Sequence, residues 1–106
     1  MEFLVHIRVG LPVDHDPEDA RVLREAEAVR GAELYELGVL ERIWRVPGRR
    51  EAIGIWRAAD ATELHELLTS LPLFGWCDID VVPLATHYVE EGARSRRPRT
   101  DAARAR

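Results

Sequence analysis

The chain lacks the features that would indicate a membrane protein, a secreted protein or a nucleotide-dependent enzyme. No apolar run approaches the ~20 residues needed to cross a bilayer, and the N-terminus shows no basic segment followed by an apolar stretch, so no signal peptide is predicted. The single cysteine, Cys77, has no partner for an internal disulfide. No phosphate-binding glycine loop or dinucleotide fingerprint occurs. These absences predict a cytoplasmic protein with no membrane partner.

Lysine is also absent, so all 15 basic residues are arginines, and they are unevenly placed. Residues 1–93 carry nine arginines and eighteen acidic residues, a net charge of −9, whereas six arginines and one aspartate give residues 94–106 a net charge of +5. An acidic body argues against nucleic-acid binding by the folded part. Clustered like charge with few apolar residues is typical of disorder, although such a segment can also touch nucleic acid or an acidic partner. We therefore predict one folded domain over residues 1–90 and a basic, disordered tail over residues 91–106.

The period of the apolar pattern changes along the chain. Alternate apolar residues from Phe3 to Val9 predict a strand with one apolar face. Asp16 and Pro17 suit the start of a helix, and Gly38 suits its end. The remaining elements are expected to be strands over 39–46 and 52–57, a helix over 60–71 and a strand over 78–84.

The order of these elements, β-α-β-β-α-β, predicts an α+β, ferredoxin-like fold. In this fold a four-stranded antiparallel sheet carries two helices on one face. The other face is then uncovered, and Leu4, His6 and Arg8 are expected to point there. Trp44 and Trp56 lie on the predicted hairpin and are expected to add apolar surface. An uncovered apolar face of this kind predicts self-association.

Four short motifs resemble the muconolactone isomerase family. They are the segments Leu11 to Asp14, Ile43 to Arg45, Leu71 to Phe74 and Asp78-Ile79, within a likeness that runs from Met1 to about Val89. The resemblance implies a dimeric αβ-barrel, dimer units within a decamer, and an isomerase that works without cofactor or metal. Such enzymes move a ring double bond of muconolactone, a small lactone, during the breakdown of aromatic compounds.

The chain also departs from the family pattern. It has Gly75-Trp76 where members often carry a Pro-Tyr pair, Ile53 where they have Tyr, and Glu41 where they tend to have a basic residue. If these positions shape the pocket, the substrate differs from muconolactone itself.

Glu27 is the first candidate for chemistry. At ~100° per residue it shares one helical stripe with Leu23, Arg30 and Leu34, and this stripe is expected to face the sheet. One hypothesis is an ion pair between Glu27 and Arg30 at the edge of the core. The other is a carboxylate in an apolar pocket, where desolvation raises its pKa and makes it a proton carrier. The family pattern has an acidic residue at this place and favours the second hypothesis.

The chemistry that the resemblance implies needs few groups. A proton leaves the ring carbon γ to the lactone carbonyl and returns at the α carbon, so one carboxylate can serve both steps. Glu27 is predicted to be this base, with Arg45 or Arg8 anchoring the substrate carboxylate and His6 donating to the dienolate oxygen. Trp44 and Phe74 complete the predicted substrate-binding set, although Trp44 also suits a subunit interface.

Two other functions fit the same fold. One is a small cofactor-free monooxygenase, which would need a pocket wide enough for a fused ring system. The other is a non-catalytic ligand-binding or assembly protein, which would be favoured if Glu27 were fully paired with Arg30 and no cavity reached it.

Overall fold

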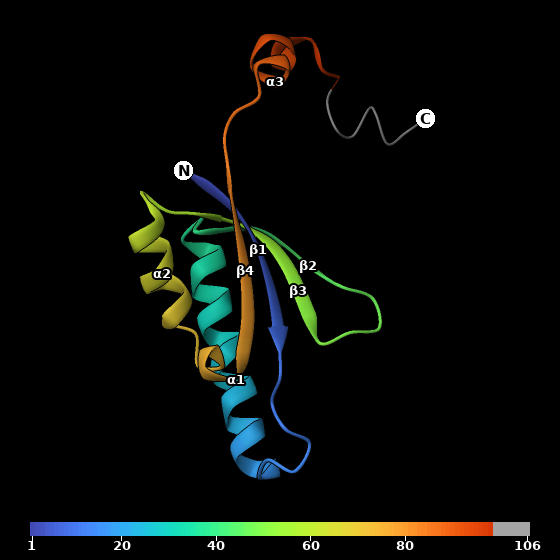
Figure 1. Cartoon of the computed structure of the whole chain (residues 1–106), viewed down its shortest axis with the longest axis vertical. Helices are drawn as coiled ribbons and strands as arrows, with labels where there is room; N and C mark the ends of the chain where they lie inside the picture. The colour runs from blue at the N-terminus through green and yellow to red at the C-terminus, as the bar shows by residue number, and fades with distance from the viewer. Residues whose placement is uncertain (99–106) are drawn as a thin grey trace.

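The computed structural model describes residues 1–98 and shows a four-stranded antiparallel sheet with two helices on one face (Figure 1). In chain order the elements are β1 (Glu2–Val9), α1 (Pro17–Glu36), β2 (Leu40–Arg45), β3 (Glu51–Arg57), α2 (Ala61–Thr69), β4 (Cys77–Leu84) and α3 (Tyr88–Ala93). The strands lie in the order β2-β3-β1-β4, and every neighbouring pair is antiparallel. This is the ferredoxin-like order, so the predicted fold class is confirmed.

Both ends of α1 follow from local sequence. The Asp16 side chain accepts a hydrogen bond from the Asp19 N–H at 3.0 Å, which caps the first turn. Gly38 ends the helix with φ of 77°, a left-handed conformation that glycine adopts without strain. The Val39 N–H then donates to the Leu34 carbonyl at 3.0 Å, as in a Schellman motif, and turns the chain into β2. Neither α1 nor any other helix within residues 1–98 is long and apolar enough to span a membrane.

The core lies between the sheet and the two helices. Phe3 and Val5 of β1 are 1% and 0% exposed, so the alternation predicted for this strand is confirmed. Trp56 was expected on the uncovered face but is 2% exposed in the core, because it pairs with Phe3 across β1 and β3. The helices contribute leucines to the same core, namely Leu34, Leu64 and Leu68.

The C-terminal region is described as far as residue 98. The boundary expected after residue 90 falls inside α3, and a 3-10 turn follows at Arg94–Arg96. Local contacts account for this helix, because the His87 ring caps the Val89 N–H at 3.0 Å and Arg94 donates to Glu90 at 3.1 Å. Residues 99–106 of the predicted tail lie outside the described part. Figure 1 shows α3 standing away from the sheet beyond the end of β4.

Gly54 is required by close packing in β3. A Cβ atom at this position would lie 2.8 Å from the Arg42 carbonyl oxygen and 3.2 Å from Leu40 Cδ1. The first contact is with backbone, which cannot move aside cheaply. We expect Gly54→Ala to destabilise the fold by about 1–3 kcal/mol and to lower Tm by several degrees. Thermal unfolding followed by circular dichroism measures this, with Gly75→Ala as the control because its Cβ would meet nothing within 4 Å. An unchanged Tm for Gly54→Ala would show that the β2–β3 pair adapts.

Candidate active site

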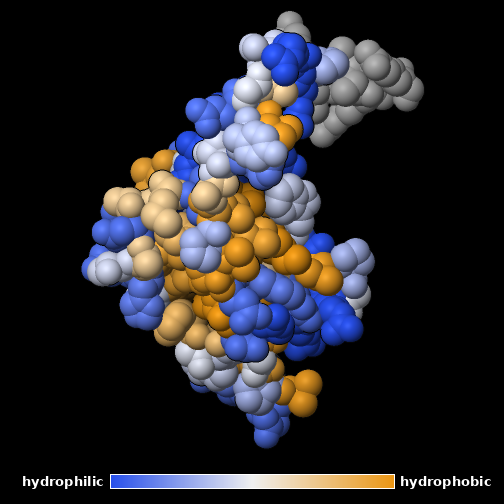
Figure 2. Space-filling model, turned by 45° about the horizontal axis from the view of Figure 1, so that its top comes forward, coloured by the Kyte–Doolittle hydropathy of each residue, from blue (hydrophilic) through white to orange (hydrophobic). Residues whose placement is uncertain are grey.

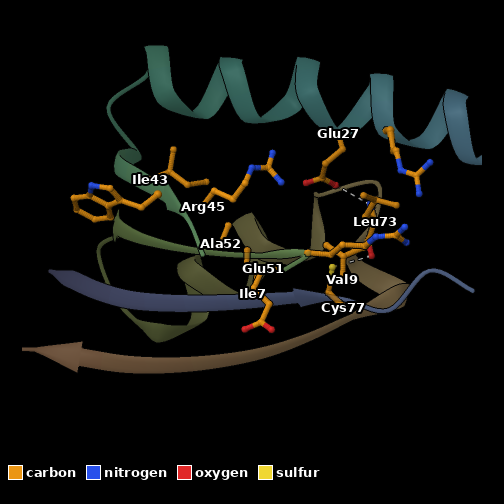
Figure 3. A pocket seen from close by; sticks show the side chains of 12 residues that line it. Ile7, Val9, Glu27, Ile43, Arg45, Glu51, Ala52, Leu73 and Cys77 are labelled. Carbon is orange, nitrogen blue, oxygen red and sulfur yellow. Dashed lines mark hydrogen bonds between the residues drawn. The ribbon is translucent and has the colours of Figure 1, made fainter. Parts of the chain in front are cut away.

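A cavity of about 670 Å³ opens between α1 and the helix-covered face of the sheet (Figure 3). This volume lies within the range of small-molecule binding sites. Its apolar lining comes from the four strands and from the turn between α2 and β4, namely Ile7, Val9, Ile43, Ala52, Leu73 and Cys77. Its charged lining includes Arg24, Glu27, Arg45 and Arg50. Glu51 and Trp44 border the cavity from strand positions whose side chains point to the uncovered face of the sheet.

Glu27 reaches this cavity from the middle of α1. Its Oε1 accepts a hydrogen bond from the backbone N–H of Leu73 at 2.8 Å, a contact drawn in Figure 3. The predicted ion pair with Arg30 does not form, because Arg30 donates instead to Glu33 at 3.0 Å and to the Ser70 hydroxyl at 3.0 Å. Glu27 is therefore a half-buried carboxylate held by a backbone amide rather than half of an ion pair.

The surroundings of Glu27 favour its protonated form. Burial raises the pKa of the Glu27 carboxyl above its ordinary value, and the Leu73 N–H offsets part of this rise. A carboxylate with a raised pKa takes up a proton more readily than an exposed glutamate does, and near neutral pH it can still release that proton. The site therefore has the protonation behaviour expected of a proton carrier.

The turn between α2 and β4 fixes the Leu73 amide. Leu71 and Leu73 are each 6% exposed and anchor the turn in the core. The Leu73 carbonyl accepts from the Trp76 N–H at 2.9 Å and from the Cys77 thiol at 3.2 Å. Burial, and then the charge of Glu27, raise the pKa of the Cys77 thiol, which keeps it a donor. The Leu73 N–H that donates to Glu27 is thus held in place by the burial of the Leu73 side chain and by the hydrogen bonds to the Leu73 carbonyl.

Three arginines give the cavity positive charge. Arg45 pairs with Ala52 across β2 and β3, and Figure 3 shows its side chain on the same side of the sheet as Glu27. The sequence prediction missed Arg24 and Arg50, which also line the cavity. Arg24 could have been found, because it precedes Glu27 by three residues and so lies beside it on α1. Arg50 lies in the β2–β3 turn, where no periodic pattern reveals the direction of a side chain.

His6 and Arg8 do not line this cavity. They alternate with the buried residues of β1 and so point to the uncovered face of the sheet. Arg8 donates to Asp80 at 2.6 Å and to Asp78 at 3.2 Å. His6 lies 2.8 Å from Glu51 through Nε2 and 3.4 Å from Arg8 through Nδ1. Since arginine only donates, the tautomer that fits both contacts has the proton on Nε2. The hydrogen bond from His6 lowers the pKa of Glu51.

The two predicted aromatic residues have different positions. Trp44 borders the cavity, but it pairs with Ile53 and so points to the uncovered face of the sheet. Its side chain is 46% exposed there and has the Arg42 guanidinium 4.7 Å from its ring centre. Phe74 lies outside the cavity, because it packs against the core and meets the His65 ring edge-on at 6.4 Å. Of the predicted substrate-binding residues, the structure therefore places only Arg45 on the same side of the sheet as Glu27.

The positions that depart from the family pattern lie away from the cavity lining. Glu41 is bound by Arg57 at 3.0 Å. Ile53 is the cross-strand neighbour of His6 and faces the uncovered side of the sheet. Gly75 and Trp76 form the 3-10 turn before β4, and neither lines the cavity. These departures therefore do not by themselves alter the surface that a ligand in this cavity would contact.

Known proteins resemble this chain over most of its length. The family model described as muconolactone delta-isomerase matches residues 1–90. Muconolactone Delta-isomerase 2 of Acinetobacter lwoffii is 36% identical, over 82% of this chain and 91% of that protein. Muconolactone Delta-isomerase of Rhodococcus opacus is 37% identical, over 79% and 92%. A crystal structure of muconolactone isomerase superposes with a TM-score of 0.78 at 34% identity, covering 82% of this chain and 91% of that chain. A dehydrochlorinase from Burkholderia phenoliruptrix shares the fold alone, with a TM-score of 0.59 at 17% identity.

Proposed function

The chain belongs to the muconolactone delta-isomerase family, and we propose that Glu27 is the base with which it moves the ring double bond of muconolactone or a related butenolide. The observation that carries this assignment is the half-buried carboxylate in the cavity, bound by the Leu73 N–H at 2.8 Å. The chain is an isomerase of aromatic catabolism, as its relatives are. Its predicted cytoplasmic location remains part of the proposal.

The proposed reaction is an intramolecular proton transfer. Glu27 removes the proton from the γ carbon of the ring, and the electron pair moves through the double bond onto the carbonyl oxygen as a dienolate. The same carboxyl then returns the proton to the α carbon, which gives the 3-oxoadipate enol-lactone. The hydrogen bond at Oε1 orients the carboxylate and leaves its second oxygen available for the proton. No atom is gained or lost, so one carboxyl that reaches both carbons on one face of the ring is sufficient.

The arginines supply the positive charge that this reaction needs. The substrate carries a carboxylate arm, and we assign Arg45 as its anchor because a guanidinium can donate two parallel hydrogen bonds to a carboxylate. Negative charge also develops on the carbonyl oxygen. With His6 outside the cavity, Arg24 takes over the proposed role of donor there, since it lies one helical turn from Glu27.

The two alternative functions fit less well. A non-catalytic protein would be favoured by a Glu27 fully paired with Arg30 and out of reach of a cavity, and neither condition holds. A monooxygenase would need room for a fused ring system. The cavity volume is compatible with that, but the family of the chain is a family of isomerases.

An ultraviolet assay of the purified full chain with muconolactone, without added metal or cofactor, tests the function. We expect turnover to the enol-lactone, followed as a change in absorbance. Absence of turnover with muconolactone and with its chloro and methyl derivatives would overturn the proposed reaction.

We further propose that the chain assembles through the uncovered face of its sheet, with a dimer as the smallest unit and a decamer as the larger assembly. Leu4 lies between Ile55 and Val82 in one cross-strand row, and Val82 is 49% exposed. Arg8, Asp78 and the neighbouring charges occupy the next rows of this face. Figure 2 also shows a broad apolar area in the middle of the visible face, below α3. A second copy can cover the apolar row and offer charges of both signs to these polar groups.

Ile55→Arg tests this assembly. A buried, unpaired guanidinium at the centre of an interface costs several kcal/mol, so we expect the variant to shift towards monomer at micromolar concentration in light scattering. Val29→Arg is the matched control, because Val29 is 61% exposed on the outer side of α1. A wild-type chain that is already monomeric would refute the proposed assembly.

A further inference from the structure

A glycine interrupts the sheet-facing stripe of α1 one helical turn after the cavity residue Glu27. Gly31 follows Glu27 by one helical turn and precedes the fully buried Leu34 by three residues, so all three lie on the face turned to the sheet. A Cβ atom on Gly31 would meet nothing within 4 Å. Glycine inside a helix destabilises it by about 1 kcal/mol relative to alanine. Open space thus persists beside Gly31, at a position where a larger residue would stabilise the helix.

Two apolar side chains of the sheet line one end of the cavity. Ile43 of β2 and Ala52 of β3 line the cavity there, and both are on the strand face turned to the helices. Figure 3 shows them towards one end of the cavity, while Glu27, Leu73 and Cys77 lie towards the other. Arg45 lies between the two ends. The cavity therefore has a reactive end and an apolar end.

We propose that the apolar end holds an alkyl substituent on the substrate ring, so that the preferred substrates are alkyl-substituted butenolides with a carboxylate arm. This inference rests on the proposed function and narrows its substrate class. The substituent has to be on the α or β carbon of the ring, because the γ carbon must keep the proton that Glu27 removes. Arg45 and Ala52 are cross-strand neighbours, so the carboxylate anchor and the apolar floor adjoin.

The size of the effect follows from apolar binding. One methylene in an apolar pocket changes the specificity by about 10- to 200-fold. Filling the space with a leucine side chain from Gly31 removes room for more than one carbon. We therefore expect Gly31→Leu to lower the ratio of kcat/KM for an α- or β-ethyl lactone to that for unsubstituted muconolactone by roughly 10- to 100-fold.

Two further variants make this measurement specific. Ala28→Leu adds the same side chain to the exposed side of α1 and should leave the ratio unchanged. Ala52→Val fills the space from β3 and should lower the ratio in the same direction, which covers the case of a Gly31→Leu chain that does not fold. A wild-type enzyme that excludes the ethyl lactone, or a ratio equally changed by Ala28→Leu, overturns the inference.

Calorimetric binding separates this inference from the proposed reaction. If the wild-type chain turns over no lactone but binds the ethyl lactone more tightly than muconolactone, and Gly31→Leu abolishes the difference, the substrate class stands and the reaction falls. If muconolactone is turned over and neither binding nor kcat/KM distinguishes the ethyl lactone in wild type and Gly31→Leu, the reaction stands and the substrate class falls.

Discussion

Glu27→Gln is expected to lower kcat by about 10²- to 10⁴-fold while the fold and the assembly stay intact. Glutamine has nearly the same size, and its amide oxygen can still accept the hydrogen bond from the Leu73 N–H. It cannot take up a proton, so the loss measures the contribution of the base. The variant and the wild type are compared in the ultraviolet assay and in thermal unfolding.

Melting temperature distinguishes this reading from a structural one. Arg30 bonds to Glu33 and Ser70, so removing the charge of Glu27 leaves no arginine unpaired. Burial of the ionised carboxylate costs stability, and glutamine removes that cost, so we expect an equal or higher Tm. Near-normal turnover of Glu27→Gln with a lowered Tm would contradict the catalytic assignment.

The raised pKa of Glu27 also fixes a pH dependence with a definite sign. Catalysis needs the ionised form, so kcat/KM falls as pH drops through the folded-state pKa, above the pH at which an exposed glutamate titrates. Stability behaves oppositely, since a raised carboxyl pKa means that the folded state binds the proton more tightly. The stabilisation that Glu27 contributes is therefore present below its pKa in the unfolded state and is lost as pH rises through its pKa in the folded state. Glu27→Gln should remove both trends.

Arg45→Gln is expected to have the second-largest effect, on KM rather than on kcat. Hydrogen bonds to charged groups contribute about 1.5–3 kcal/mol, so the loss in kcat/KM should be on the order of 10- to 100-fold. Arg45→Lys should recover only part of it, because an ammonium lacks the planar fork that binds a carboxylate through two donors.

Arg42→Gln is the matched control for this prediction. Arg42 is on the same strand, but it stacks over the Trp44 ring at 4.7 Å rather than lining the cavity. If light scattering shows that its assembly is unchanged, Arg42→Gln should keep the wild-type KM. Equal losses in the two variants would mean that the charge of β2 as a whole, and not one anchor, binds the substrate.

Much of the fold could be predicted because its signals are local. The Asp16 cap, Gly38 at the end of α1 and the alternation along β1 each reflect a constraint within a few residues. Glu27 was found in the same way, as a charged residue on an apolar helical stripe. Its true partner, the Leu73 amide, lies 46 positions away, and no periodic pattern contains such a contact.

The position of His6 and Arg8 relative to Glu27 follows from a pattern that the sequence already contains. Alternation along β1 placed His6 and Arg8 opposite Phe3 and Val5, yet both were assigned to the same substrate as Glu27 on the helix side. A sheet separates the two faces, so one small ligand cannot contact both. Phe74 is outside the cavity lining for another reason, since the 3-10 turn after α2 packs it against the core.

The bond between Leu73 and Glu27 joins chain segments that belong to opposite halves of the β-α-β-β-α-β order. Its donor is a single backbone amide, which nuclear magnetic resonance observes directly. Protonation of the carboxyl weakens this hydrogen bond, so the chemical shift of the Leu73 amide follows the ionisation of Glu27 without any substrate present. The exchange of its hydrogen with solvent deuterium, in turn, follows how often the turn detaches from α1. One amide signal thus reports both the ionisation of Glu27 and how often its hydrogen bond to Leu73 opens.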